Sequence, residues 1–401
     1  MAVRTDAADD PYGLDSLTLD GLRARPGAKW AGVGGRLAAW VADMDFPIAA
    51  AIRERLVELA ATDVGYANWP RVHRSPLPEL FAARSEQRFG WAPDVDRLHE
   101  VADVMQGVQV AVHHLSRPGD GVVVHVPAYP PFLATVAEME RRLVEVPAAL
   151  VDGAWAFDHD ELDARLRRNP ARVLVLCHPH NPTGHVFTRP ELEQVADIVT
   201  RHRLVVVSDE IHAELVHPGH AHVPFASLST EVAARTVTVT SSSKAFNLAG
   251  LRWAILHAGS DELHAALRAL PQHYLGAPNV LAVAATDAAW RHGDGWQQAV
   301  AARLDANRQL VGHLLAEHLP AARYAVPDAT YLAWLDMREC GFDGDPAAAL
   351  RRRGVELSPG PRFGPHGEGF ARLNFATSAA VLTEIVAAMG RGGEFSDEVY
   401  P

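Results

Sequence analysis

Four side chains that could share one chemical task follow four apolar runs of the sequence: Lys244, Asp209, Asn181 and Tyr129. The runs are short and rich in valine, and they cover residues 122–124, 173–176, 204–207 and 237–240. Continuous apolar runs of this length predict strands that are buried on both faces. Ligands of open α/β sheets bind beyond the carboxyl ends of the strands. We therefore expect the amine, the carboxylate, the amide and the phenol to face one site.

Lysine is rare in this chain. Of the 37 basic residues only two are lysines, Lys29 and Lys244, and arginine takes all the other basic positions. Arginine stays protonated and forms no Schiff base, whereas a neutral lysine amine can attack a carbonyl group. We therefore expect Lys244 to be needed for the chemistry, and we interpret Lys29 as a chance survivor of the compositional bias.

The surroundings of these groups would suit pyridoxal 5'-phosphate (PLP). Its aldehyde needs a lysine, its ring nitrogen needs an anion, and its ring face needs a stacking partner. Its phosphate needs hydroxyl groups, an arginine and backbone N–H groups at the start of a helix. The sequence offers the hydroxyl groups of Ser241 and Ser243 directly before Lys244, and residues 105–109 precede a predicted helix.

The order of the predicted elements indicates two domains. Apolar strands alternate with helical stretches between residues 46 and 285, including a helix that begins after Thr188 and runs to about His202. This alternation predicts a large α/β domain with a mostly parallel sheet. Residues 286–401 contain long helical segments and short strands, which predict a smaller α+β domain that residues 1–45 would join.

Composition and charge argue against several classes of protein. Hydrophobic residues make up 48% and charged residues 21%, as in ordinary globular chains. The net charge of −12 argues against nucleic acid as the main partner, and no apolar run reaches the ~20 residues of a membrane helix. The first residues show no secretory signal pattern, and Cys177 and Cys340 imply no disulfide framework. We therefore expect a cytoplasmic protein.

Three motifs carry a resemblance to a known family. They are Ser241-x-x-Lys244 with Arg252 eight residues later, the stretch 208–212 (Ser-Asp-Glu-Ile-His), and the stretch 40–46 (Trp-Val-Ala-Asp-Met-Asp-Phe). On these motifs the chain resembles fold-type I PLP enzymes of the aspartate-aminotransferase superfamily, aminotransferase class I/II. Within them it is most similar to MalY/PatB-type cystathionine β-lyases (C-S lyases). The resemblance implies an aspartate-aminotransferase-like α/β fold, with a mostly parallel, seven-stranded-type sheet in the large domain and a smaller α+β domain.

The resemblance implies a role for each group around the cofactor ring. Lys244 would bond to the cofactor aldehyde and then remove the Cα proton of the substrate. Asp209 would pair with the ring nitrogen and keep it protonated, and Asn181 would hydrogen-bond the ring O3'. His212 would lie near O3', and Tyr129 would stack on the ring. Asn181 and Tyr129 would also line the substrate site.

The resemblance also implies the phosphate and substrate contacts. The phosphate ligands would be Ser241, Ser243, Arg252 and the backbone of Gly107 and Val108. Tyr66 would act as a catalytic residue that reaches the phosphate of the neighbouring subunit, which makes a homodimer with shared active sites necessary. Arg372 would bind the α-carboxylate of the substrate in a bidentate manner, and Ala42 would line the substrate pocket.

The predicted reaction is α,β-elimination from an S-substituted L-cysteine, which gives a thiol, pyruvate and ammonia. Two alternatives use the same residues: an aminotransferase, and a decarboxylation-coupled deaminase of a cysteine S-conjugate in a biosynthetic pathway. A non-enzymatic regulator built on this fold is a further class. The acidic chain argues against DNA binding, and the presence of Lys244 argues against an inactive copy.

A cluster of histidines offers a competing interpretation as a metal site. Its members are His212, His217, His220 and His222. Their spacing fits no standard metal site, and the Pro-Gly pair at 218–219 favours a solvated loop. We therefore predict no metal.

The sequence departs from the family pattern at several positions. His178 and His185 stand where asparagine and arginine are usual, and the stretches 106–109 and 271–274 are also uncommon. We expect these residues to lie near the cofactor or in the pocket lined by the dimer, where they would bear on the choice of substrate.

Overall fold

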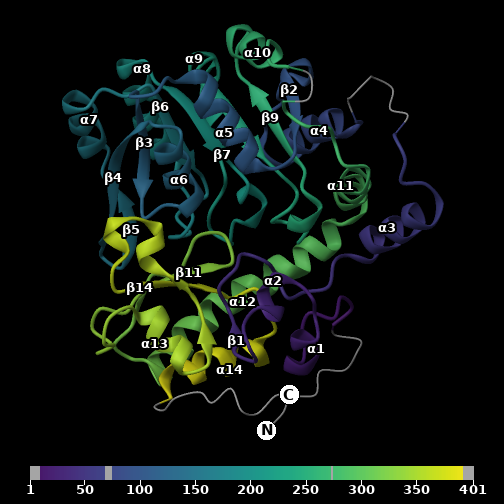
Figure 1. The fold of residues 1–401 in the computed structure, drawn as a ribbon, viewed down its shortest axis with the longest axis vertical. Helices are drawn as coiled ribbons and strands as arrows, with labels where there is room; N and C mark the ends of the chain where they lie inside the picture. Colours follow the sequence, from purple (N-terminus) through teal and green to yellow (C-terminus); the bar gives the residue numbers. More distant parts are fainter. Residues whose placement is uncertain (1–9, 68–74, 272–273, 392–401) are drawn as a thin grey trace.

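The computed structural model describes residues 10–67, 75–271 and 274–391. Figure 1 shows an upper part built around a large sheet and a lower part built around a small sheet, with the N-terminal helices beside the small sheet. The long helix α12 (Asp294–His318) starts beneath the upper part and crosses the lower part. Chain segments that are distant in sequence therefore meet between the two sheets.

The large sheet contains eight strands in the described chain. They are β2 (Leu98–Val101), β3 (Gly121–Val126), β4 (Arg142–Val151), β5 (Ala154–Phe157), β6 (Val173–Cys177), β7 (Val205–Asp209), β8 (Thr236–Thr240) and β9 (Ala254–Ala258). Their order is β2-β9-β8-β7-β6-β3-β4-β5. The pairs from β4 to β8 are parallel, β9 is antiparallel to both neighbours, and β5 forms an antiparallel hairpin with β4. The mostly parallel sheet is confirmed, and the hairpin adds one strand to the seven expected.

Helices cover both faces of this sheet, because successive residues of a strand point to opposite sides. In β3, Val122 and Val124 belong to one apolar cluster and Val123 belongs to another. The first cluster includes side chains of α5 (Val104–Leu115), α6 (Pro130–Glu138) and α10 (Asp261–Arg268). The second includes side chains of α7 (His159–Arg168) and α8 (Arg189–His202). The start of α8 agrees with its prediction, since Thr188 and Glu191 form a capping box there.

The small sheet lies in the lower part. Its strands are β10 (Arg323–Tyr324), β11 (Leu332–Asp336), β14 (Phe370–Asn374) and β13 (Ser358–Pro359), in that order and all antiparallel. A separate parallel pair joins β1 (Leu37–Ala38) to β12 (Val355–Glu356), which ties the N-terminal segment to the C-terminal part. The boundaries predicted at 45/46 and 285/286 stay a prediction, and residues 1–9 and 392–401 of the predicted small domain lie outside the described residues.

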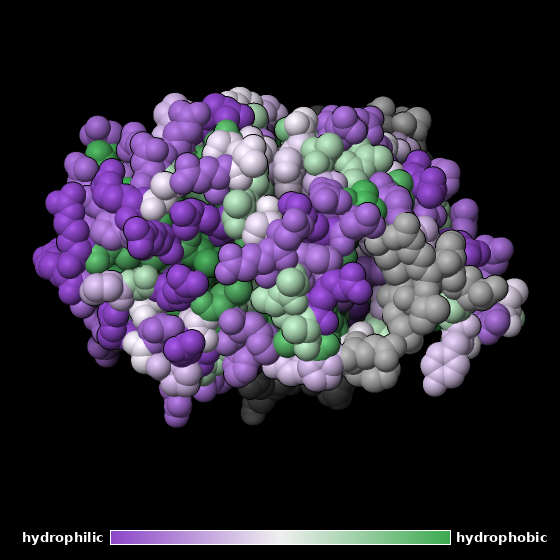
Figure 2. Space-filling view, turned by 90° about the horizontal axis from the view of Figure 1, so that it is seen from above, coloured by the Kyte–Doolittle hydropathy of each residue, from purple (hydrophilic) through white to green (hydrophobic). Residues whose placement is uncertain are grey.

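The remaining helices surround the two sheets. They are α1 (Leu19–Arg23), α2 (Ala28–Ala31), α3 (Ala50–Thr62), α4 (Leu77–Phe89), α9 (Thr230–Ala233), α11 (Val280–His292), α13 (Pro346–Arg352) and α14 (Ala379–Gly390). Hydrophilic residues cover most of the face seen from above, and the apolar ones lie between them in small groups (Figure 2). Within the described chain no helix combines the length and the apolar character that a membrane span requires.

Candidate active site

A cavity of about 460 Å³ lies at the carboxyl ends of the central strands. It brings together eight of the residues that the sequence singles out: Ala42, Tyr129, Asn181, Asp209, His212, Ser243, Lys244 and Arg252. These residues come from the carboxyl ends of four strands, from the turn before β9 and from the segment before α3, so that they are far apart in sequence. The common edge of the parallel strands explains why they meet.

The amine of Lys244 is held by the backbone of the 40–46 segment. Its Nζ donates a hydrogen bond of 2.8 Å to the carbonyl oxygen of Ala42, and the hydroxyl of Tyr331 donates to the same oxygen at 2.8 Å. Burial lowers the pKa of the Lys244 amine, although the neighbouring Asp43 and Asp209 carboxylates act in the opposite direction. The amine is therefore easier to deprotonate than an exposed lysine.

The carboxylate of Asp209 ends β7 and is only 4% exposed. The amide N–H of Ile211 donates to its Oδ1 at 3.0 Å. Burial raises the pKa of Asp209 to about 7, because the carboxylate has lost water without gaining a close cation. A cationic ring nitrogen in the cavity would supply that missing charge, so the position fits the pyridinium nitrogen of PLP.

Arg372 contacts Asn181 but is not itself among the residues that line the cavity, and it is 5% exposed. Its Nη1 donates to Asn181 Oδ1 at 3.1 Å, and its Nη2 donates to the carbonyl oxygen of Trp40 at 3.1 Å. Its Nε is buried and has no hydrogen-bond partner among the described residues. Burial lowers the pKa of Arg372 to about 10, so it remains a cation at neutral pH with a donor left for an anion.

Two rings complete the wall of the cavity. His212 is 2% exposed, and its Nδ1 has no hydrogen-bond partner within the described chain. Burial lowers its pKa to about 3, so the imidazole is neutral at physiological pH. Tyr129 precedes α6 and packs edge-on against Phe132, and burial raises the pKa of its phenol. A neutral imidazole and a protonated phenol suit contact with a planar ring.

A polar corner lies beside Lys244. Ser241 Oγ donates to the carbonyl oxygen of Trp253 at 2.6 Å and accepts from the amide of Ser243 at 3.1 Å, which shapes the turn after β8. Arg252 has a left-handed backbone with a φ of 60°, and its Nη2 lies 2.5 Å from Asp103 Oδ2. The hydroxyl of Ser243, the guanidinium of Arg252 and the start of α5 converge there, as a phosphate group would need.

The expected role of Gly107 and Val108 in phosphate binding is wrong in this structure. Both lie in the second turn of α5 and do not line the cavity, and the Gly107 amide already donates to the Asp103 carbonyl at 3.1 Å. Asp103 caps the helix, so that the first turn, residues 104–106, faces the cavity instead. Gly107 serves packing: a Cβ there would lie 2.7 Å from Val239 Cγ1 of β8.

Tyr66 lies away from the cavity of its own chain. It follows α3 in a segment without regular secondary structure, and its side chain is fully exposed. Val57 and Val64 nearby are also exposed, with 64% and 57% of their surface accessible. A single chain therefore gives Tyr66 no partner in its own site.

Two expectations about histidines are wrong, and a third holds only for part of its segment. His178 and His185 do not line the cavity. His178 is fully buried and stacks on His222, whose Nε2 lies 3.0 Å from Glu210 Oε2. In the 212–222 stretch only residues 218–221 are solvent-exposed, whereas His217 and His222 are buried against the Thr330 carbonyl and the Glu210 carboxylate. No group of His, Cys, Asp and Glu in the described residues is arranged to hold a metal ion.

Sequence reasoning also missed two residues near the site. Tyr331 precedes β11 and shares the Ala42 carbonyl with Lys244, a contact that no local pattern announces. Lys29 is 5% exposed and lies 3.0 Å from Asp45 Oδ1. The rarity of lysine in this chain was the signal that could have identified Lys29, but the sequence alone led us to interpret Lys29 as a chance survivor of the compositional bias.

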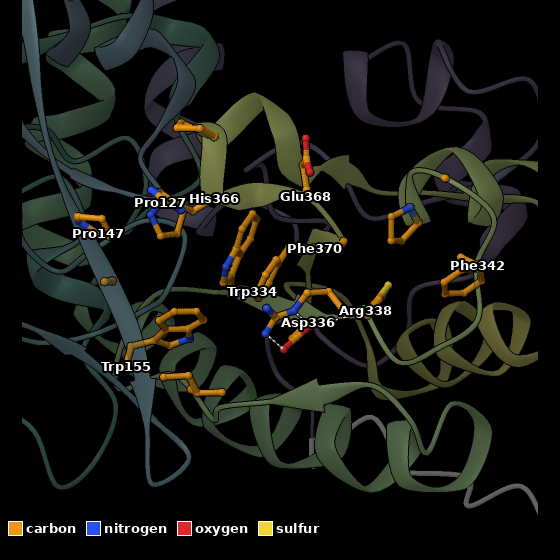
Figure 3. Close-up of a pocket in the computed structure, with 17 residues that line it drawn as sticks. Pro127, Pro147, Trp155, Trp334, Asp336, Arg338, Phe342, His366, Glu368 and Phe370 are labelled. Atoms are coloured by element: carbon orange, nitrogen blue, oxygen red, sulfur yellow. Dashed lines mark hydrogen bonds and ion pairs between the residues drawn. The ribbon is translucent and has the colours of Figure 1, made fainter.

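A second cavity of about 650 Å³ separates the β4–β5 hairpin from the small sheet (Figure 3). Trp155 faces it from the hairpin, and Trp334 and Phe370 stack within the small sheet with ring centroids 5.3 Å apart. Asp336 and Arg338 form an ion pair of 2.7 Å beside them. This cavity is larger than the first but is lined by no lysine, and its buried carboxylate, Asp336, already has Arg338 as its cation.

Known proteins resemble this chain over most of its length. Residues 104–389 match the aminotransferase class I and II family. The cystathionine β-lyase PatB of Bacillus subtilis is 35% identical over 356 residues, covering 88% of this chain and 91% of PatB. Protein MalY of Escherichia coli is 32% identical over 358 residues, covering 87% of this chain and 89% of MalY. The PLP-bound C-S lyase of Staphylococcus hominis superposes with a TM-score of 0.84 at 28% identity, covering 93% of this chain and 99% of that structure. The chain therefore belongs to the aminotransferase class I and II family.

Proposed function

We propose that the protein is a PLP-dependent carbon–sulfur β-lyase that cleaves S-substituted L-cysteines. The observation that carries this proposal is the pairing, in one cavity, of a buried amine with a lowered pKa and a buried carboxylate with a pKa of about 7. The relatives named as cystathionine β-lyase and C-S lyase support elimination over transamination. PLP is the cofactor that this pair of groups and those relatives support together.

Bound PLP supplies an electron sink for the negative charge that develops at Cα. Lys244 would hold the cofactor through its Nζ. As a free amine its Nζ would remove the Cα proton, and the Ala42 carbonyl would orient it by accepting one of its N–H groups. The electron pair left at Cα forms a Cα–Cβ double bond and expels the thiolate from Cβ. The released 2-aminoacrylate reacts with water to give pyruvate and ammonia.

Asp209 acts by its charge. As a carboxylate it would accept the N–H of the protonated ring nitrogen, and the cation would in turn favour the ionised form of Asp209 over the neutral one. The raised pKa of the free carboxyl, about 7, then falls once the two charges pair. Asn181 would donate its side-chain N–H groups to the ring O3', and Tyr129 would cover one face of the ring.

Arg372 and Asn181 would receive the α-carboxylate of the substrate. The unpaired Nε of Arg372 and its contact with Asn181 support this assignment, and Ala42 borders the same space. The phosphate would lie against Ser241, Ser243, Arg252 and the first turn of α5. We propose that the residues 46–285 and the two flanking parts, 1–45 and 286–401, are the domains between which this substrate binds.

We further propose that two copies of the chain form a homodimer. The full exposure of Tyr66 and of the valines near it supports a partner surface there, and the phenol would then reach the phosphate in the partner's site. The acidic net charge and the two free cysteines support a cytoplasmic protein without a nucleic-acid partner.

Product analysis tests the reaction. The PLP-loaded protein is incubated with cystathionine and with S-alkyl cysteines, with and without a keto-acid acceptor. We expect pyruvate, ammonia and free thiol without any acceptor. Turnover that requires an acceptor and leaves the thioether intact would make the protein an aminotransferase. Release of carbon dioxide with ammonia would instead support the decarboxylation-coupled deaminase.

A further inference from the structure

The 40–46 segment is fixed by side chains along its whole backbone. Each of its seven consecutive carbonyl oxygens accepts at least one hydrogen bond from a side chain elsewhere in the protein. Asn374 Nδ2 bridges the carbonyls of Val41 and Asp43 at 2.6 and 2.7 Å. Asn247 Nδ2 bridges those of Met44 and Phe46, both at 3.0 Å. An irregular segment held in this way has one defined position.

This segment connects the two cations of the active site. The Trp40 carbonyl accepts from Arg372 Nη2, and two residues later the Ala42 carbonyl accepts from Lys244 Nζ. Any displacement of the segment would therefore move the amine and the guanidinium together. Near-attack geometry tolerates little error, since a misplacement of about 1 Å can cost roughly 100-fold in rate.

A buried ion pair anchors the far side of the segment. Lys29 Nζ lies 3.0 Å from Asp45 Oδ1 and donates to the Asp43 carbonyl at 3.2 Å. The indole of Trp30 donates to the same Asp45 oxygen at 2.7 Å. Lys29 and Asp45 are 5% and 1% exposed, so water does not weaken their attraction. The indole of Trp40 also contacts Lys29, because its Nε1 donates a hydrogen bond to the Lys29 carbonyl oxygen at 3.1 Å.

The two lysines of the protein thus meet this segment at adjacent carbonyls, Lys244 at Ala42 and Lys29 at Asp43. Arginine occupies all the remaining Lys or Arg positions of the chain, and the use of lysine at these two positions has a physical reason. A compact ammonium fits between the Asp45 carboxylate and the Asp43 carbonyl, whereas a planar guanidinium is bulkier and directs its donors in a fixed fork.

We propose that Lys29 is a positioning residue, whose ion pair with Asp45 fixes the 40–46 segment and thereby sets Lys244 and Arg372 in place. The proposal rests on the proposed function, since it explains how this site is aligned. Lys29 itself touches neither substrate nor cofactor. It acts through the Asp43 and Asp45 contacts, which hold Ala42 and Trp40.

Four variants test this role: Lys29→Arg, Lys29→Met, Asp45→Asn and the double variant Lys29→Met/Asp45→Asn. We expect kcat/KM for S-methyl-L-cysteine to fall about 10- to 100-fold in all four. Thermal unfolding separates alignment from stability. Lys29→Met leaves a buried charge without a partner and should lower the unfolding midpoint most, whereas the neutral double variant should regain most of it.

Two further measurements do not depend on turnover. The pH titration of the cofactor absorbance in the holoenzyme reports on the Lys244 nitrogen, which Asp43, Asp209 and Arg372 face. We expect its midpoint to move to lower pH in Lys29→Arg and in the double variant, which leave the net charge of the pair unchanged, because the Ala42 carbonyl and Asp43 favour the protonated form. Calorimetric binding of propanoate, a carboxylate without an amine, should weaken because Arg372 is displaced.

Arg165→Met provides a matched control, because Arg165 forms an ion pair of 2.6 Å with Glu161 on the surface of α7. It should leave all four readouts unchanged. A double variant that regains the absorbance midpoint and propanoate binding together with stability would overturn the proposal, as would a Lys29→Arg variant with wild-type values. If the wild type makes no pyruvate, the proposed reaction fails while the titration still tests Lys29.

Discussion

Two equally buried carboxylates, one in each cavity, differ in what their surroundings allow them to do. Asp209 in the smaller cavity and Asp336 in the larger one are both 4% exposed. Burial alone would raise the pKa of both. In Asp336 the hydrogen bonds and charge of Arg338 overcome burial and lower the pKa, whereas in Asp209 burial prevails and the pKa rises to about 7.

The comparison supports the proposal that the smaller cavity is the active site. Asp336 already has its cation within the chain, at 2.7 Å, so it has no electrostatic reason to bind another. Asp209 lies without such a partner beside an amine that can lose its proton. Volume does not identify the active site, because the cavity beside Asp336 has about 650 Å³ and the cavity beside Lys244 has about 460 Å³.

The largest expected effect is that of removing the amine. Lys244→Ala should abolish turnover and covalent attachment of PLP, because no other side chain of the cavity can replace a neutral amine. Pyruvate formation and the absorbance of the bound cofactor measure both losses. Normal turnover in this variant would mean that the smaller cavity is not the active site.

Asp209→Asn should lower kcat by about 100- to 1,000-fold, because a neutral amide does not stabilise a protonated ring nitrogen. Protonation of Asp209 in the wild type removes the same negative charge. Since the carboxyl titrates near pH 7 before the cofactor binds, PLP affinity should weaken as the pH falls below 7. Measuring the dissociation constant of PLP between pH 5.5 and 8 tests this, because the pKa of Asp209 sets the pH at which the affinity falls. The same pH dependence in Asp209→Asn would contradict the assignment.

Arg372→Lys should raise KM for amino-acid substrates about 10- to 100-fold, because a point charge cannot form the bidentate contact. Steady-state kinetics distinguish this from an effect on kcat. In the wild type the pKa of Arg372 is about 10, so KM should stay constant at neutral pH and rise as the pH passes that value. An unchanged KM in the variant would exclude Arg372 from the carboxylate role.

Tyr66→Phe should weaken PLP affinity by a smaller factor, about 3- to 10-fold, because one hydrogen bond is lost. Mixing and reassociating this variant with Lys244→Ala provides the sharper test. A shared site predicts that hybrid dimers contain one complete active site, so the single site of each hybrid should bind PLP with wild-type affinity. A hybrid whose PLP affinity stays at the weakened value of Tyr66→Phe would leave Tyr66 without a role across the interface.

The smallest effect on catalysis is expected in the larger cavity. Trp155→Ala should change kcat/KM by less than about twofold while lowering the free energy of unfolding by roughly 1–2 kcal/mol, as loss of a half-buried ring does. Kinetics and denaturant unfolding of the same preparation measure both. A fall in kcat/KM comparable to that of Arg372→Lys would mean that the two cavities are not independent.

Sequence could predict the residues at strand ends because a strand and its turn are local. Lys244, Asp209 and Asn181 each follow an apolar run by a few residues, and the common strand edge then brings them together. The position of Gly107 could not be predicted in this way, because the start of α5 depends on the Asp103 side chain.

Contacts between distant elements were not visible in the sequence. Lys29 becomes important only when Asp45 folds against it, and Tyr331 only when the small sheet approaches Ala42. The burial of His178 depends likewise on its stacking against His222. Each of these errors concerns a polar side chain whose partner lies outside its own strand or turn.

The immobility of Arg372 has a consequence for the handedness of the substrate. Its guanidinium is fixed by Asn181, by the Trp40 carbonyl and by the ring of Phe363, which lies 5.0 Å away. With the roles proposed above, a substrate would be held by this cation through its carboxylate and by the cofactor through its nitrogen. The Cα–H bond of one enantiomer would then point toward Lys244 Nζ, and in the mirror image the side chain would take that place. Two fixed anchors and one base would therefore select one enantiomer without any contact to the sulfur substituent.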